Sequence, residues 1–112
     1  MKISEAKEKF VFTTRIDLND DGSEYIVLKE PNSKVVTEIG EDGVKNFETM
    51  TKAFPDCVIE SSITNDDGTP ADAKAIVNVL KESGTLFTFV IGAWIQSIPF
   101  QSRLAKVTKS DK

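Results

Sequence analysis

Residues 9–29 have the sequence KFVFTTRIDLNDDGSEYIVLK. The first nine are mostly β-branched and aromatic, and alternate positions share one side of an extended chain, which predicts a strand over 9–17. The alternating residues on that side are Phe10, Phe12, Thr14 and Ile16. Asp21-Gly22 then signals a chain reversal, and residues 24–29 form the returning strand. A bare hairpin is only marginally stable in water, so later elements are expected to cover its apolar face.

Helical signals follow the hairpin. Pro31 ends the second strand, and residues 32–39 predict two helical turns stopped by Gly40. Asp42 is a good N-cap for a second helix that Pro55 is expected to close. Residues 57–63 fit either a short strand or an extended connection, and 65–68 form a turn. The sequence therefore predicts an α+β fold, in which an N-terminal antiparallel β-hairpin precedes a small bundle of three to four helices.

Two further helices complete the predicted bundle. Thr69 and Pro70 suit the cap and first position of a helix, in which Asp72 lies near the positive end of the dipole. An apolar stripe at helical spacing runs through Ala73, Ile76, Val77 and Leu80. Thr85 is expected to cap a last helix over about 86–98, which Pro99 ends. We expect one domain over 1–100 and a flexible basic tail over 101–112.

The last predicted helix is apolar around most of its circumference. Its apolar residues cover an arc of roughly 240°, interrupted by a narrow strip of Thr88, Gly92 and Gln96, whereas an ordinary surface helix has an apolar stripe nearer to ~100°. Either this helix lies at the centre of its own fold, or one side of it binds a partner. The partner hypothesis predicts a protein-binding surface at Phe87, Val90, Ile91, Trp94, Ile95 and Ile98. A membrane span is not expected, since about 13 residues of helix reach only ~20 Å.

Composition points away from catalysis. The 112 residues include no histidine, the commonest general base and metal ligand. The single cysteine, Cys57, lies beside Val58 and Ile59, which favours a buried, inert thiol over a nucleophile and suggests a reducing compartment. A net charge of −4 makes nucleic acid an unfavourable partner. We expect a non-enzymatic, cytoplasmic protein without a cofactor, catalytic residue or metal ligand.

Residues 17–22 match the opening of a calcium loop, D-x-[DN]-x-[DN]-G, through Asp17, Asn19 and Asp21. Position 12 of such a loop falls on Leu28, so the bidentate glutamate is missing. The missing glutamate favours an acidic hairpin turn, and a calcium-binding module at residues 17–22 is the alternative.

Charge is unevenly distributed along the chain. Residues 100–112 contain Arg103, Lys106, Lys109 and Lys112 against Asp111, a net charge of +3, and the remaining residues carry −7. This segment is either a solubilising tail or a tether that attracts an acidic partner segment.

The order of elements resembles that of the tail-assembly chaperones of long-tailed bacteriophages and prophages. The resemblance covers roughly residues 9–100 and includes the strand end Leu28-Lys29-Glu30-Pro31 before the first helix. It implies a protein of the bacterial host cytoplasm that binds the tape-measure protein, or another tail protein, during virion assembly. The client would bind to the apolar last helix. Independently of the resemblance, an exposed Trp94 face would make the protein a candidate homo-oligomer. The alternative is a structural minor tail protein of a phage or phage-like particle.

Overall fold

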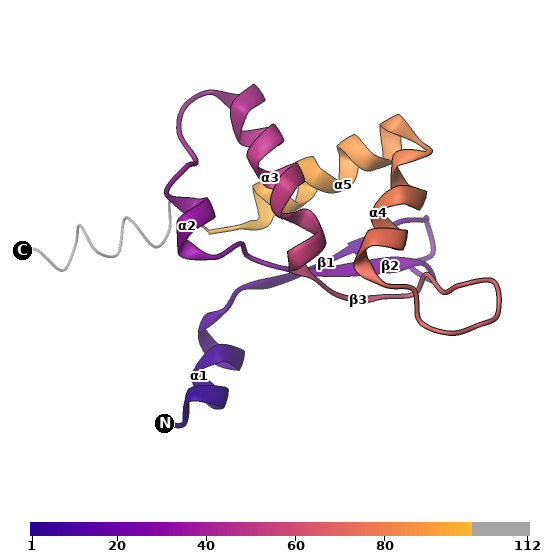
Figure 1. The fold of residues 1–112 in the computed structure, drawn as a ribbon, viewed down its shortest axis with the longest axis horizontal. Helices are drawn as coiled ribbons and strands as arrows, with labels where there is room; N and C mark the ends of the chain where they lie inside the picture. Colours follow the sequence, from indigo (N-terminus) through magenta and orange to yellow (C-terminus); the bar gives the residue numbers. More distant parts are fainter. Residues whose placement is uncertain (100–112) are drawn as a thin grey trace, which may run out of the picture.

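The computed structural model describes residues 1–99, so the predicted tail at 101–112 lies outside the described residues. Within them the fold is α+β, as predicted: a three-stranded antiparallel sheet with helices packed on one face (Figure 1). The strands are β1 (Thr13–Asp17), β2 (Tyr25–Lys29) and β3 (Val58–Ser61), in the order β1-β2-β3. The helices are α1 (Ile3–Phe10), α2 (Ser33–Val36), α3 (Gly43–Cys57), α4 (Ala73–Lys81) and α5 (Gly84–Ser97).

The predicted hairpin is confirmed, but its first strand is shorter than the predicted 9–17: β1 begins at Thr13, and Lys9 and Phe10 belong to α1. β1 pairs with β2 in a register that sets Ile16 opposite Ile26, and both side chains are buried. Gly22 adopts a positive φ of 73° in the turn, a conformation that glycine reaches without steric cost. The ambiguous segment after Cys57 forms β3, the third strand. Its pairing with β2 shifts register between Val27 and Leu28, which leaves Ile59 as the extra residue of a bulge.

Several helix boundaries differ from the prediction. The first predicted helix is shorter, since α2 ends at Val36, and the N-cap of α5 is Ser83, which accepts from the Leu86 amide, in place of Thr85. Pro55 does not close α3, which continues to Cys57. The longer helix keeps Cys57 on the buried face that also contains Met50, Ala53 and Phe54. The free energy gained by this burial offsets the loss of the backbone hydrogen bond that proline cannot donate. The predicted cap at Thr69 is also wrong: Pro70 pairs with Thr64 in a β-bridge, and Asp72 is the N-cap of α4, accepting from the Ala75 amide.

The helix α1 was not predicted. Its N-cap Lys2 makes no side-chain capping bond, so the usual start signal is missing, and none of its residues is buried. Figure 1 shows α1 on the opposite side of the sheet from α3, α4 and α5. The N-terminal helix therefore contributes little to the core that the other elements share.

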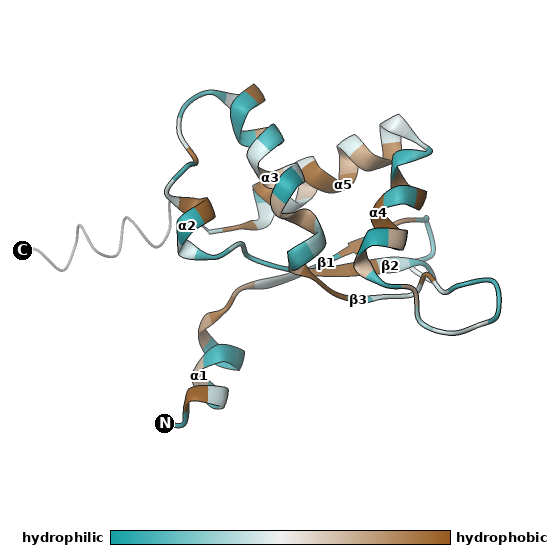
Figure 2. Cartoon of the chain, in the orientation of Figure 1, coloured by the Kyte–Doolittle hydropathy of each residue, from teal (hydrophilic) through white to brown (hydrophobic). Residues whose placement is uncertain are grey.

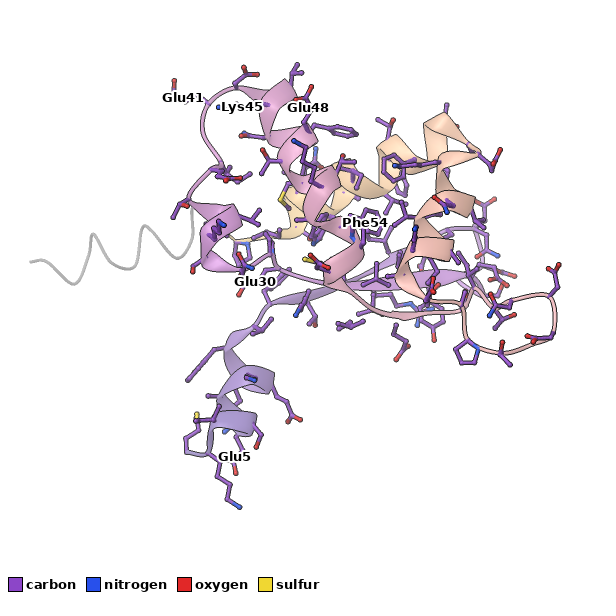
Figure 3. The ribbon with its side chains drawn as sticks, in the orientation of Figure 1. Glu5, Glu30, Glu41, Lys45, Glu48 and Phe54 are labelled. Atoms are coloured by element: carbon purple, nitrogen blue, oxygen red, sulfur yellow. The ribbon has the colours of Figure 1, made fainter. Side chains whose placement is uncertain are left out.

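One hydrophobic core fills the space between the sheet and the helices α3, α4 and α5. Apolar residues concentrate along α5 and the strands, and hydrophilic residues are frequent on α3 and in the loop before α4 (Figure 2). Phe54 lies in the interior, whereas Glu41, Lys45 and Glu48 surround the outer end of α3 (Figure 3). Among residues 1–99, α1 is the only helix on the side of the opposite face of the sheet (Figure 1).

Candidate protein-binding surface

The surface predicted on α5 is buried inside the monomer. Its members have exposed fractions of 9% for Phe87, 0% for Val90, Ile91 and Trp94, and 6% for Ile98, and Ile95 is half-buried against the core. The expectation that these residues bind a partner is therefore wrong for the folded monomer. The central-helix alternative holds because α5 is covered on three sides, by α3, by α4 and by β1.

Specific contacts hold α5 in this position. Phe54 of α3 stacks on Phe87 with ring centroids 5.9 Å apart, and its ring also meets that of Trp94 at 5.7 Å. The Trp94 indole Nε1 donates a hydrogen bond of 3.1 Å to the Lys29 carbonyl of β2. A buried indole with a satisfied N–H is a core residue, and it ties α5 to the sheet. On α5, Phe89 keeps 56% of its surface exposed, beside the polar strip.

The uncovered face of the sheet carries a chain of polar contacts. Arg15 pairs with Asp17 at 3.1 Å, and its guanidinium lies 4.0 Å above the Tyr25 ring. The Tyr25 hydroxyl donates a 2.8 Å hydrogen bond to Glu60 of β3. This bond to a carboxylate raises the pKa of Tyr25, because loss of the phenol proton would place two negative charges together. These contacts cross all three strands and fix the exposed side chains of the sheet.

A hollow of about 540 Å³ lies between α1 and the uncovered face of the sheet. We call it the α1–sheet hollow. It is lined by Lys7, Glu8, Val11, Thr13, Lys29 and Ile59. Ile59, the extra residue of the bulge in β3, has an exposed fraction of 52%, and Val11 is half-buried. Sequence reasoning missed this surface because it depends on two unpredicted features, the helix α1 and the bulge. The sequence contained one indication of this surface: the apolar residue Ile59 lies in a segment that fitted either a strand or an extended connection, so its side chain could be either buried or exposed.

The candidate calcium loop folds as a hairpin turn. Asp17 pairs with Arg15, and the Asn19 side chain donates to Ser23 and accepts from the Glu24 amide. Asp21 accepts from the Ser23 amide, and this bond lowers the pKa of Asp21. In the part of the chain that the structure describes, no cluster of three or more potential ligand side chains is arranged to hold a metal ion. The three side chains serve the turn.

Cys57 is 3% exposed at the end of α3. Burial raises the pKa of its thiol to about 11, because a thiolate would lose its hydration; Lys29 nearby acts in the opposite direction. A thiol with so high a pKa is protonated at neutral pH and is a poor nucleophile. This agrees with the interpretation of Cys57 as an inert core residue.

Comparison of the chain with models of protein families, with curated proteins and with solved structures gives no match. Among residues 1–99, none of the helices is long and apolar enough to cross a membrane.

Proposed function

We propose that this protein is a non-enzymatic protein-binding factor that binds its partner at the α1–sheet hollow. The observation that carries the proposal is the position of α1, a helix with no buried residue that borders a hollow on the uncovered sheet face. An exposed apolar side chain lines the hollow, Ile59 at 52% exposure. A helix that adds nothing to the core is best explained by a surface that it helps to build.

The resemblance of the sequence to tail-assembly chaperones supplies the kind of partner. We propose the tape-measure protein as the client and the bacterial host cytoplasm as the compartment, with the binding site moved from α5 to the α1–sheet hollow. Helical clients insert apolar side chains at helical spacing into such hollows. Lys7, Lys29 and Glu8 on its border give it a small excess of positive charge, which favours a client helix with acidic residues beside its apolar stripe.

Co-expression with the tape-measure protein of the same gene cluster tests the proposal. The wild-type chain is expected to raise the soluble fraction of that protein and to elute with it from a sizing column. Ile59→Asp places a charge in the hollow and is expected to lower co-elution at least tenfold. Val79→Asp is the matched control, because Val79 of α4 is 55% exposed and lies outside the hollow.

Two results would contradict the proposal. Equal binding by the two variants would exclude the α1–sheet hollow as the site. Absence of any complex with the wild-type chain would exclude the tape-measure protein as the client.

A further inference from the structure

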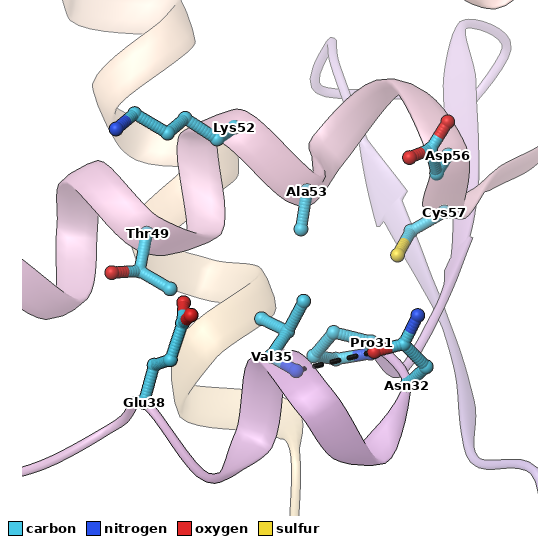
Figure 4. Close-up of a pocket in the computed structure, with 9 residues that line it drawn as sticks. All are labelled: Pro31, Asn32, Val35, Glu38, Thr49, Lys52, Ala53, Asp56 and Cys57. Carbon is cyan, nitrogen blue, oxygen red and sulfur yellow. Dashed lines mark hydrogen bonds between the residues drawn. The ribbon is translucent and has the colours of Figure 1, made fainter.

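A second depression lies between α2 and α3, on another part of the surface. Two adjoining hollows of about 240 and 280 Å³ share Pro31, Asn32, Asp56 and Cys57 in their lining, so they form one continuous groove, the α2–α3 groove. Val35 of α2 and Ala53 of α3 point toward one another across it (Figure 4). Its floor is apolar through Pro31, Val35, Ala53 and Cys57.

The border of the groove is acidic. Glu30, Glu38 and Asp56 line it, against Lys29 and Lys52. The acidic character continues past the groove, since Glu41, Asp42 and Glu48 follow near the start of α3 with Lys45 as the nearby base. A ligand that suits this groove combines apolar side chains with several positive charges.

The chain itself contains such a segment directly after α5. Residues 100–112 place Phe100, Leu104 and Val107 at intervals of four and three, with Arg103, Lys106 and Lys109 between and after them. Their net charge of +3 contrasts with −7 over residues 1–99.

The position of the end of α5 makes the two regions neighbours. Ile98 is buried in the core, which fixes the point where the chain leaves it, and Figure 1 shows this end of α5 running to α2. Thirteen residues can span at most ~45 Å when extended. The length of the α2–α3 groove, bounded by the four-residue helix α2, lies well within that reach.

From these observations we infer that the segment 100–112 docks in cis into the α2–α3 groove, with its apolar residues on the floor and its basic residues beside Glu38 and Asp56. The inference does not depend on the proposed client. Because the α2–α3 groove and the α1–sheet hollow share Val11 and Lys29 in their linings, the docked segment lies next to the proposed binding site.

Disulfide trapping in the full chain tests the inference. Leu104→Cys is combined with Lys52→Cys, which lies on the groove, or with Lys45→Cys, which lies on the same face of α3 two turns away. Both pairs remove one lysine, and both are made with Cys57→Ala, because Cys57 lines the floor of the groove and would otherwise compete for the disulfide. We expect the intramolecular disulfide to form at least tenfold faster with Lys52→Cys than with Lys45→Cys.

Charge variants complete the test. Glu38→Gln with Asp56→Asn, or 1 M NaCl, is expected to slow the Lys52→Cys trapping several-fold, because both weaken the attraction to the basic segment. The inference would be overturned by equal rates of disulfide formation in the two pairs. It would also be overturned if neither the charge variants nor 1 M NaCl changed the rate of the Lys52→Cys pair. Disulfide-linked dimers in place of the intramolecular product would show that the groove binds a second copy, which also overturns docking in cis.

Discussion

Trp94→Ala should remove a large share of the stability of this domain. The side chain is 0% exposed, contacts Phe54 and donates a hydrogen bond to the Lys29 carbonyl. A buried aromatic side chain covers ~150–250 Å², worth about 4–6 kcal/mol as an upper estimate at ~25 cal/mol per Å². Measured costs of such truncations are about 3–5 kcal/mol. We therefore expect the free energy of unfolding to fall by about 4 kcal/mol, out of the ~5–15 kcal/mol of a typical domain.

Urea denaturation followed by far-ultraviolet circular dichroism measures this change, since Trp94 is the single tryptophan and its fluorescence is lost in the variant. With a slope of about 1–3 kcal/mol per molar, a loss of about 4 kcal/mol should lower the urea midpoint by roughly 1.3–4 M. Phe89→Ala is the matched control on the same helix: Phe89 is 56% exposed, and we expect a change of about 0.5 kcal/mol or less. Equal and small effects of both substitutions would refute the placement of α5 in the core.

Three other predictions concern Cys57, Asp42 and the turn at residues 17–22. Because the pKa of Cys57 is raised in the folded state, the folded protein keeps the thiol proton between pH 9 and about 11, whereas the unfolded chain loses it. The contribution of this thiol to the free energy of unfolding should therefore be constant below pH 9 and fall between pH 9 and about 11. Urea titrations at several pH values measure this fall, and Cys57→Ala should remove it. Asp42→Ala removes the cap that accepts from the Val44 and Lys45 amides and should cost about 1 kcal/mol by thermal unfolding, whereas Asp42→Ser should retain most of the stability. Calorimetry with millimolar calcium should give no binding heat, since the oxygens of Asp17 and Asp21 are engaged in the turn; a saturable heat would restore the calcium-module alternative.

Local signals in the sequence were sufficient for the hairpin turn and for the starts of α2 and α3, but not for those of α1, α4 and α5. Asp21-Gly22 specified the turn, and Asp42 is the N-cap that its position predicted. Where tertiary burial competes with a local signal, the local signal failed. Pro55 lies inside α3 because Cys57 beyond it is buried, and Thr69-Pro70 belongs to a β-bridge while Asp72 caps α4.

The position of α5 could not be decided from the sequence, since the apolar arc fitted both a core helix and a docking helix. In the structure the sheet, α3 and α4 each cover one side of this helix, so it is a core helix. The exposed strip predicted around Thr88 and Gln96 is where α5 meets solvent. The α1–sheet hollow was beyond sequence reasoning because α1 lacks a capping side chain and its neighbour Ile59 is exposed by a register shift.

Hydrogen–deuterium exchange of the complex with the tape-measure protein tests the central claim most directly. If α5 is core and the α1–sheet hollow is the binding site, client binding should slow exchange in residues 3–13 and 58–61, and amides of 84–97 should be equally protected in the free and bound protein. Slower exchange on binding that is confined to 84–97, with α1 and β3 unchanged, would contradict the account.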